Sequence, residues 1–239
     1  MKNRILLTAC LALLQALFVA PAALGQSSNV SAVSVQLGGR IVRIPTPDKF
    51  TDSMLHFPRI ASRLIAAESP TNEVLAVHVT DEIVSVLRDG QDPDVPFYTK
   101  VSVFKELKGV EVEPWDFNAL VSDFEKQSPG ALQSVVKKAE KDMGDRLNDF
   151  WGSDAGLRIG ETRMLGYFDK QPQSISSMFL MNIEQFDRKV VILGSMSLLY
   201  VNKRVLFLYV FRIPTGTADQ ERVEGVTKSW TAKTIAANK

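Results

Sequence analysis

Residues 190–213 read VVILGSMSLLYVNKRVLFLYVFRI, and this stretch decides the fold. It predicts two strands, Val190–Val201 and Val205–Ile213, joined at Asn202-Lys203-Arg204. A strand with one wet face alternates apolar and polar residues, whereas these two are apolar almost throughout, as strands covered on both faces are. A membrane span is excluded because Lys203 and Arg204 lie in the middle of the stretch, where charges are costly in lipid. We therefore expect central strands with helices above and below them.

Strand patterns elsewhere extend this sheet. Val33–Leu37 and Arg40–Ile44 alternate apolar and polar residues, and Gly38-Gly39 separates them. Two glycines between alternating runs predict a hairpin, because both can take positive φ. Further strands are expected at Val74–Val79, Phe97–Leu107, Leu157–Phe168 and Ser174–Glu184, the last two joined across Asp169–Gln173.

Helical patterns fall between and after these strands. Pro58 and Pro114 are each placed to begin a helix, Thr80 is expected to cap a short helix from Asp81 to Arg88, and Thr217-Ala218-Asp219-Gln220 forms a capping box. The apolar face of the Pro114 helix is expected at Phe117, Leu120, Val121 and Phe124, and that of a helix beginning at Ser128-Pro129 at Leu132, Val135, Val136, Ala139, Met143, Leu147 and Phe150. The last helix is expected to run through Trp230 to about Ala237. These patterns predict one α+β domain, residues 33–239, with a mainly antiparallel sheet and helices on both faces, an α/β/α sandwich.

The first 25 residues have the layout of a secretory signal peptide. Lys2 and Arg4 precede an apolar run, Ile5–Ala20, and small residues follow up to Gly25. The run is shorter than the ~20 residues that span a bilayer, which disfavours a membrane anchor. Leu7-Thr8-Ala9-Cys10 matches a lipobox but does not close the apolar stretch, which disfavours a lipoprotein. We expect cleavage near Gly25, a flexible leader at 26–32, and a periplasmic or secreted bacterial protein with no integral membrane span.

Composition bounds the classes of function. Removing 25 of the 239 residues leaves 214, which suffices for a substantial core. The chain has 28 basic and 27 acidic residues; loss of Lys2 and Arg4 leaves 26 against 27, a net charge of −1 that does not favour nucleic acid. Cys10, the only cysteine, leaves with the signal peptide, so the mature chain has neither a disulfide nor a thiolate. The sequon Asn29-Val30-Ser31 is without meaning in a bacterium.

Two histidines are the first residues to consider for chemistry. His78 lies in an expected strand just before Asp81 and Glu82, and these three groups could converge on a metal. The alternative is an ordinary strand histidine followed by an acidic helix start, and the lack of a second His or Cys at ligand spacing favours it. His56 precedes a helix start and could act as a base, although loop histidines are commonly structural.

Motifs of nucleophilic or carboxylate catalysis are not evident. Gly194-Ser195-Met196-Ser197 departs from the Gly-x-Ser-x-Gly elbow, and Ser195 falls inside an expected buried strand. A glycosidase-like pair of carboxylates across a cleft stays open for three pairs, since sequence does not show distances. These pairs are Asp81-Glu82, Glu111 with Glu113, and Asp145 with Asp149.

Phosphate-binding loops and nucleic-acid patches are also not evident. The chain contains neither a Gly-x-Gly-x-x-Gly motif after a strand nor a Walker loop, and its densest basic pairs are Lys137-Lys138 and Lys203-Arg204. Trp230 and Trp151 lie on apolar helix faces and are expected in the core, which leaves Trp115 as the best candidate for an exposed contact. A hydrophobic staple at the helix start is the favoured alternative for Trp115. The sequence therefore assigns no catalytic, cofactor-binding or metal-ligating residue.

A family resemblance follows from Ile44-Pro45-Thr46-Pro47-Asp48-Lys49-Phe50 and the order of elements over most of the mature chain. The opening strands, the antiparallel sheet flanked by helices and the closing Trp-bearing helix resemble the PsbP-like fold. That fold is shared by an extrinsic photosystem subunit and a nuclear-import factor that binds a small GTPase. The chain is also similar to uncharacterised bacterial exported proteins with the same opening. The resemblance implies a non-enzymatic role in binding or assembly.

Three hypotheses of function follow. The first is an exported, periplasmic binding or accessory protein without catalytic activity, whose partner is a protein of the cell envelope. The second is a hydrolase with a non-standard carboxylate site. The third is a carrier of a small apolar ligand, which requires a hollow between the sheet and its helices.

Overall fold

The computed structural model describes residues 32–66, 68–126, 140–142, 144–146, 148–150, 157–185 and 188–239. They belong to the unit Ser31–Lys239 of the chain. Several sequence predictions lie outside the described residues, namely the signal peptide (1–25), most of the leader, most of the apolar stripe of the helix expected from Ser128, Lys137-Lys138 and Trp151. Ala32, predicted to end the leader, already belongs to the first strand.

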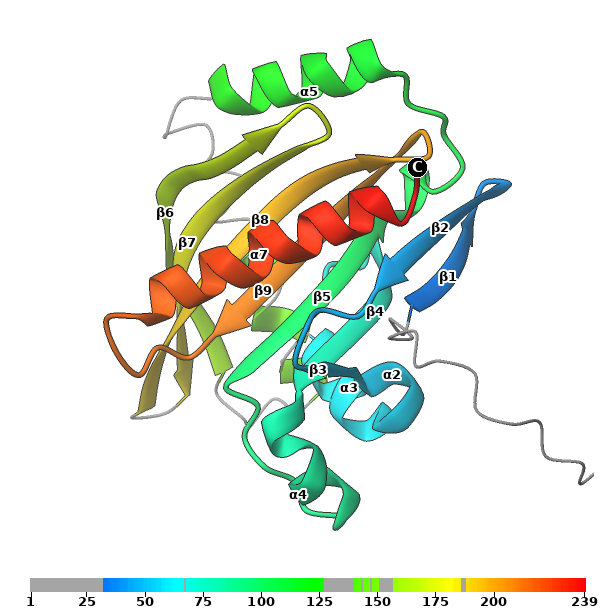
Figure 1. Cartoon of the computed structure of the whole chain (residues 1–239). Helices are drawn as coiled ribbons and strands as arrows, with labels where there is room; N and C mark the ends of the chain where they lie inside the picture. Colours follow the sequence, from blue (N-terminus) through cyan, green and yellow to red (C-terminus); the bar gives the residue numbers. More distant parts are fainter. Residues whose placement is uncertain are drawn as a thin grey trace, which may run out of the picture. The chain divides into compact units, whose positions relative to one another are not determined.

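Two antiparallel sheets form the framework (Figure 1). The larger sheet has the strand order β3-β4-β5-β9-β8-β7-β6, and every neighbouring pair in it is antiparallel. Its strands are β3 (Phe50–Asp52), β4 (Asn72–Thr80), β5 (Phe97–Phe104), β6 (Leu157–Gln171), β7 (Ser174–Gln185), β8 (Arg188–Val201) and β9 (Arg204–Arg212). The smaller sheet is a hairpin of β1 (Ala32–Leu37) and β2 (Arg40–Pro45). The predicted mainly antiparallel sheet is confirmed, and β9 is its central strand.

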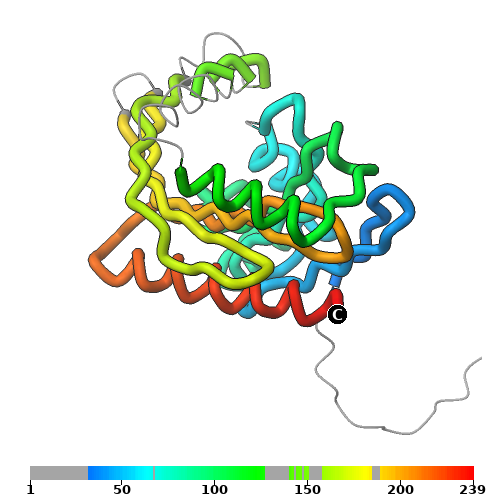
Figure 2. Tube along the Cα trace, turned by 90° about the horizontal axis from the view of Figure 1, so that it is seen from above, coloured from blue at the N-terminus to red at the C-terminus, as the bar shows by residue number. Residues whose placement is uncertain are grey.

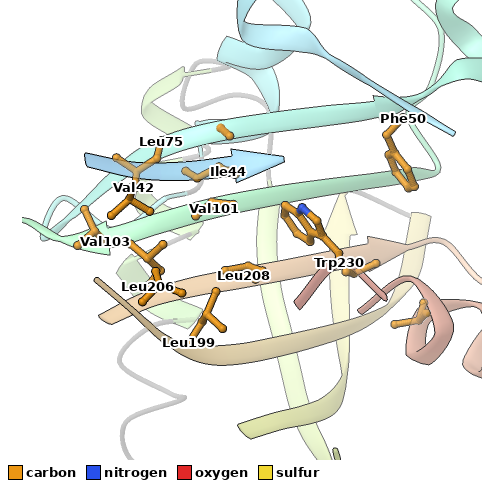
Figure 3. Close-up of a cluster of buried hydrophobic side chains, with 14 of the residues drawn as sticks. Val42, Ile44, Phe50, Leu75, Val101, Val103, Leu199, Leu206, Leu208 and Trp230 are labelled. Carbon is orange, nitrogen blue, oxygen red and sulfur yellow. The ribbon is translucent and has the colours of Figure 1, made fainter. Parts of the chain in front are cut away.

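One face of the large sheet is covered by α7 (Asp219–Ala236) and the β1–β2 hairpin. Figure 3 shows residues of the two sheets converging with Trp230 of α7 in the main core. The indole nitrogen of Trp230 donates a hydrogen bond to the Pro45 carbonyl at 2.7 Å, which joins α7 to β2. The predicted core position of Trp230 is confirmed.

The opposite face is covered by other helices. Phe117 and Val121 of α5 (Pro114–Lys126) pack on Leu198 and Val205, whose chain neighbours Leu199 and Leu206 point into the main core. Because successive strand residues point to opposite faces, α5 and α7 lie on opposite sides of the sheet (Figure 2). Next to β4 and β5, α3 (Pro58–Ile65) and α4 (Val84–Arg88) contribute a separate apolar cluster. The prediction of helices on both faces is confirmed.

Helix ends and loops differ from the sequence predictions in several places. Thr80 makes no side-chain cap, and the expected helix begins as a 3-10 turn, η1 (Asp81–Ile83). A second 3-10 turn, η2 (Lys105–Leu107), ends β5 three residues before the expected position. The short helix α2 (Ser53–His56) was not expected; its N-cap Asp52 accepts from the backbone N–H of Met54 at 2.8 Å.

The capping box predicted at 217–220 is also not formed. α7 begins at Asp219, and the N-cap Ala218 makes no side-chain hydrogen bond. Instead, the Asp219 carboxylate accepts from the backbone N–H groups of Thr215 and Gly216 and from the Arg212 guanidinium. The carboxylate thus fixes the loop that enters the helix, a task that the sequence assigned to Thr217.

The largest correction concerns Arg204, which the sequence placed in a turn. The turn consists of Asn202 and Lys203 alone, both at positive φ, and Arg204 is the first residue of β9 with only 1% of its surface exposed. Its guanidinium donates four hydrogen bonds to backbone carbonyls, to Leu37 and Val110 at 3.0 Å, to Gly38 at 2.7 Å and to Lys203 at 3.0 Å. One side chain thereby joins the β1–β2 turn, the segment before α5 and the β8–β9 turn.

Replacement of Arg204 tests this interaction. Arg204→Met keeps the length of the side chain but leaves buried carbonyls without donors, so we expect the free energy of unfolding to fall by about 3 kcal/mol. Urea unfolding followed by circular dichroism measures the change. The control is Arg59→Met, because Arg59 is 71% exposed and forms a surface ion pair with Asp92 worth about 1 kcal/mol or less. Equal losses in the two variants would contradict the role given to Arg204.

Candidate functional site

A hollow of about 350 Å³ lies between α5 and one end of the large sheet. It is formed by the start of α5, the two-residue turn between β6 and β7, and the end of β8. The lining residues are Pro114, Phe117, Asn118, Pro172, Gln173 and Tyr200. The sequence predicted a longer loop, 169–173, in place of this turn; β6 continues through Gln171, so only Pro172 and Gln173 remain to form the rim.

Tyr200 holds the floor of the hollow in place. Its ring stacks on Phe117 with centroids 5.3 Å apart, and its hydroxyl donates to the Val112 carbonyl at 3.0 Å. Its backbone N–H donates to the Gln173 carbonyl at 2.8 Å, and the Gln173 side-chain nitrogen donates back to the Tyr200 carbonyl at 3.2 Å. Burial, and then the Glu113 carboxylate, raises the pKa of Tyr200, so its hydroxyl stays a neutral donor. The floor is therefore fixed before any ligand arrives.

The chemistry of the hollow is that of contact and hydrogen bonding. Two prolines and two aromatic rings provide apolar surface. The exposed Asn118 amide makes no hydrogen bond within the described part of the chain, so it can both donate to and accept from a ligand. Such a lining suits an extended or proline-containing peptide, or a small apolar molecule with one polar group.

Trp115 follows Pro114, which lines the hollow, in the first turn of α5. It is 67% exposed, as the interpretation of Trp115 as a contact residue requires, whereas the sequence favoured a staple at the helix start. An exposed large aromatic ring next to a hollow is typical of an interaction surface. We call Trp115 and the six residues that line the hollow the α5 surface.

Ion pairs hold the segment that leads into α5. Arg40 of β2 donates to Glu111 at 2.7 Å, and Lys203 donates to Glu113 at 2.7 Å. The hydrogen bond from Arg40 holds the pKa of Glu111 below its ordinary value, and the hydrogen bond to Glu113 raises the pKa of Lys203. Glu111 and Glu113, considered as a catalytic pair, are thus ion-pair partners of basic residues. They position the α5 surface and do not face the hollow.

The structure separates His78 from the acidic residues considered with it. His78 is buried against Trp230 at a ring distance of 5.6 Å, and its Nδ1 lies 2.9 Å from the Thr99 hydroxyl. Asp81 accepts from the Thr51 hydroxyl at 2.7 Å, and Glu82 is exposed and pairs with Arg222 at 3.5 Å. Each group has its own partner in a different environment.

The remaining candidates from the sequence lie apart from the hollow. His56 is the exposed last residue of α2, and Asp145 and Asp149 are exposed. Among the described residues, no group of three or more His, Cys, Asp or Glu side chains could hold a metal ion.

Ser195 is a core residue of β8. It is fully buried, and its hydroxyl oxygen lies 2.6 Å from that of Thr227 on α7. The preceding Gly194 lies directly under the ring of Phe179, and a Cβ at this position would collide with that ring. The glycine of this sequence therefore serves packing between β7 and β8, while the serine bonds to a helix.

A buried ion pair that the sequence did not indicate lies on the α5 side of the sheet. Lys100 of β5 pairs with Glu68, and its ammonium group lies 5.1 Å from the ring centroid of Tyr209. The Asn72 amide also donates to Glu68. Burial, reinforced by Glu68, raises the pKa of Tyr209, so this phenol is neutral. The charges compensate each other, and the pair fixes the segment between α3 and β4 to the sheet.

His78 makes stability depend on pH. Burial lowers its pKa from 6.5 to about 4, against the opposing effect of the Asp52 carboxylate. The unfolded chain takes up a proton near pH 6.5, whereas the folded chain does so only near pH 4. The contribution of His78 to the free energy of unfolding is therefore complete above pH 6.5, and the free energy of unfolding falls by about 3 kcal/mol as the pH decreases to 4. Urea unfolding of the wild type and of His78→Gln over this range should show the fall only in the wild type.

Asp219 makes stability depend on pH below the range in which His78 acts. Burial would raise the pKa of Asp219, but the N–H groups of Thr215 and Gly216 and the Arg212 guanidinium lower it to about 2 from 3.8. Its contribution is present above pH 3.8 and is lost as the pH falls toward 2.

A parallel decline of the wild type and of His78→Gln between pH 6.5 and 4 would refute the assignment of the pH dependence in that range to His78.

The solved structures that are similar to this chain include two Mog1 proteins. No family model matches the chain, and no curated protein matches it either. The Ran-binding protein Mog1p of Saccharomyces cerevisiae is 11% identical with a TM-score of 0.34, and a mutant of protein Mog1 is 12% identical with a TM-score of 0.32. Each comparison covers 87% of this chain and 94% of the other. At TM-scores below 0.5, neither likeness bears on what this chain binds. In the part of the chain that the structure describes, no helix is long and apolar enough to cross a membrane.

Proposed function

We propose that this chain is an exported, non-catalytic binding protein of the bacterial cell envelope and that it engages a protein partner through the α5 surface. The observation that carries the proposal is the 67% exposure of Trp115 beside a preformed hollow lined by prolines and aromatic rings. Tryptophan is among the residues that contribute most to binding when a partner covers them. We assign no cofactor to this function.

The arrangement around α5 supports recognition by contact. The floor of the hollow is fixed by Tyr200 and Gln173, so little conformational entropy is lost when a ligand binds. The Asn118 amide adds a polar group at the rim, which can set the direction of a bound backbone. A preformed apolar hollow with a few polar groups and an exposed aromatic ring is an arrangement that protein partners use.

A second candidate function is the transport of a small apolar ligand in the same hollow. Its volume of about 350 Å³ is at the lower end of ligand pockets, and its lining is largely apolar. This function would use Tyr200 and Phe117 and would not require Trp115. Substitution of Trp115 therefore distinguishes the two functions.

Export is tested through the N-terminus of the purified protein. The small residues Ala23 and Gly25 predict cleavage after Gly25. We expect the full-length sequence, expressed in a bacterium, to yield a periplasmic protein that begins at Gln26 by intact-mass measurement. Ala23→Lys should leave the precursor uncleaved. A wild-type protein that stays in the cytoplasm with residues 1–25 attached would contradict export.

The α5 surface is tested by site-specific crosslinking in the native host. A photoreactive aromatic amino acid in place of Trp115, which keeps an aromatic ring at this position, should crosslink to one defined envelope protein, because a bound partner would cover this position. The matched control is Leu55 on α2, which is 73% exposed and belongs to a different part of the unit (Figure 1). Trp115→Ala should weaken binding of the purified partner about 30-fold, and Leu55→Ala should leave it unchanged.

Two results would overturn the proposed surface. One is crosslinking of the same proteins from positions 115 and 55, which indicates collisions and not docking. The other is an unchanged affinity of Trp115→Ala for the identified partner. Retained uptake of a hydrophobic fluorescent probe by Trp115→Ala, with loss of uptake in Tyr200→Ala, would favour the apolar-ligand function instead.

A further inference from the structure

The outer edge of β2 is closed by side chains. Arg43 directs its backbone N–H and C=O away from β1, and both bond to the Asn238 side-chain amide, at 2.8 and 2.7 Å. The Ile41 carbonyl accepts from the Asn202 amide at 2.7 Å, and the Pro45 carbonyl accepts from Trp230. Pro45 has no N–H to satisfy. These outward-pointing backbone groups of β2 are thus hydrogen-bonded within the chain.

The outer edge of β1 is open by comparison. Ser34 lies opposite Arg43 and Gln36 lies opposite Ile41, so these are the pairs whose backbone groups point away from the partner strand. Ser34 and Gln36 therefore direct their N–H and C=O groups outward. Within the described residues, nothing bonds to these backbone groups, and both side chains are exposed. An edge of this kind is a template for another strand.

The edges of the large sheet carry protection that β1 lacks. β3 has only three residues. β6 is interrupted by three irregularities in its pairing with β7, has Gly166 at a φ of +118°, and carries charges at Arg158, Glu161, Arg163, Asp169 and Lys170. Short length, bulges and charges are the devices that prevent pairing between edges. β1, with the sequence AVSVQL, contains no charge, proline or glycine.

We propose that β1 pairs antiparallel with β1 of a second copy of this chain, around a twofold axis at Ser34. In this register Ser34 faces Ser34 of the other copy, and Ala32 faces Gln36, so the outward groups of all three residues form hydrogen bonds. Val33 and Val35, which are half-buried in the single chain, become cross-strand neighbours of each other. The two hairpins then form one four-stranded sheet.

A second copy is the occupant that this segment fits. Self-pairing does not place like charges opposite each other, because none of the six residues of β1 is charged. The residue at the axis, Ser34, is small and exposed, so two of them fit face to face. A twofold contact needs such a self-complementary surface. This contact uses the β1 edge and not the α5 surface, so it stands independently of the proposed function.

A proline at the axis tests the pairing. Ser34→Pro removes an N–H that β2 does not use, and proline is tolerated at such edge positions. We expect the protein purified after expression of the full-length sequence to be a dimer by sedimentation equilibrium, and Ser34→Pro to raise its dissociation constant about tenfold or more, because two hydrogen bonds across the axis are lost. The control is Ser34→Thr, which keeps the N–H and should keep the dimer. Circular dichroism checks that all variants are folded.

Complementary charges give a second and sharper test. Ser34→Lys and Ser34→Glu each place like charges opposite each other at the axis, so each variant alone should be monomeric. A mixture of the two should form a heterodimer, because the charges then attract. A monomeric wild type would overturn the proposal. So would a wild-type dimer that Ser34→Pro, Ser34→Lys and Ser34→Glu leave unchanged, since its contact would lie elsewhere.

Discussion

The buried guanidinium of Arg204 is the interaction on which the relation between the two sheets depends. Four backbone carbonyls surround it, from the β1–β2 turn, the segment before α5 and the β8–β9 turn. Gly38 takes a positive φ there, and a Cβ on it would collide with Gly109 and with the guanidinium. The turn is thus pressed against the segment that leads to α5. Because carbonyl oxygens accept and a guanidinium only donates, one arginine can satisfy all of them without a carboxylate.

Much of the framework could be predicted because its determinants are local. The apolar run at 190–213 predicted two covered strands, and Gly38-Gly39 predicted a tight turn; the structure has both. Arg204 could not be assigned in the same way. Next to Asn202 and Lys203 an arginine is typical of a turn, and its acceptors are backbone groups up to 167 residues away, which have no side-chain pattern in the sequence. The caps expected from Thr80 and Thr217 are not formed: neither helix start has a side-chain cap, and ahead of α7 the Asp219 carboxylate accepts from the loop residues Thr215 and Gly216.

The candidate site was predictable only in part. Trp115 stands at a helix start with proline before it, a context that favoured a staple and left exposure as the alternative that the structure shows. The hollow itself joins Pro114 to Pro172 and Tyr200, which meet because the β6–β7 turn and the end of β8 lie under α5. That meeting depends on the strand order and on how closely α5 approaches the sheet. Neither is encoded by spacing along the chain, so the residues of the hollow carried no common pattern.

The same side chain, Arg204, holds both proposed contact surfaces in position. Arg204 anchors the hairpin whose outer strand offers open backbone groups, and it also anchors the segment that places Trp115. The ion pair between Arg40 and Glu111 links the same two segments from the solvent side, but such an exposed pair contributes little energy by itself. The buried hydrogen bonds therefore set both positions, and a shift of the hairpin on pairing with another strand would act on the start of α5 through the same carbonyls. Binding at the β1 edge can influence the α5 surface only if the carbonyl groups around Arg204 move. Because these groups are closely packed around Gly38, we expect the two surfaces to be rigidly connected.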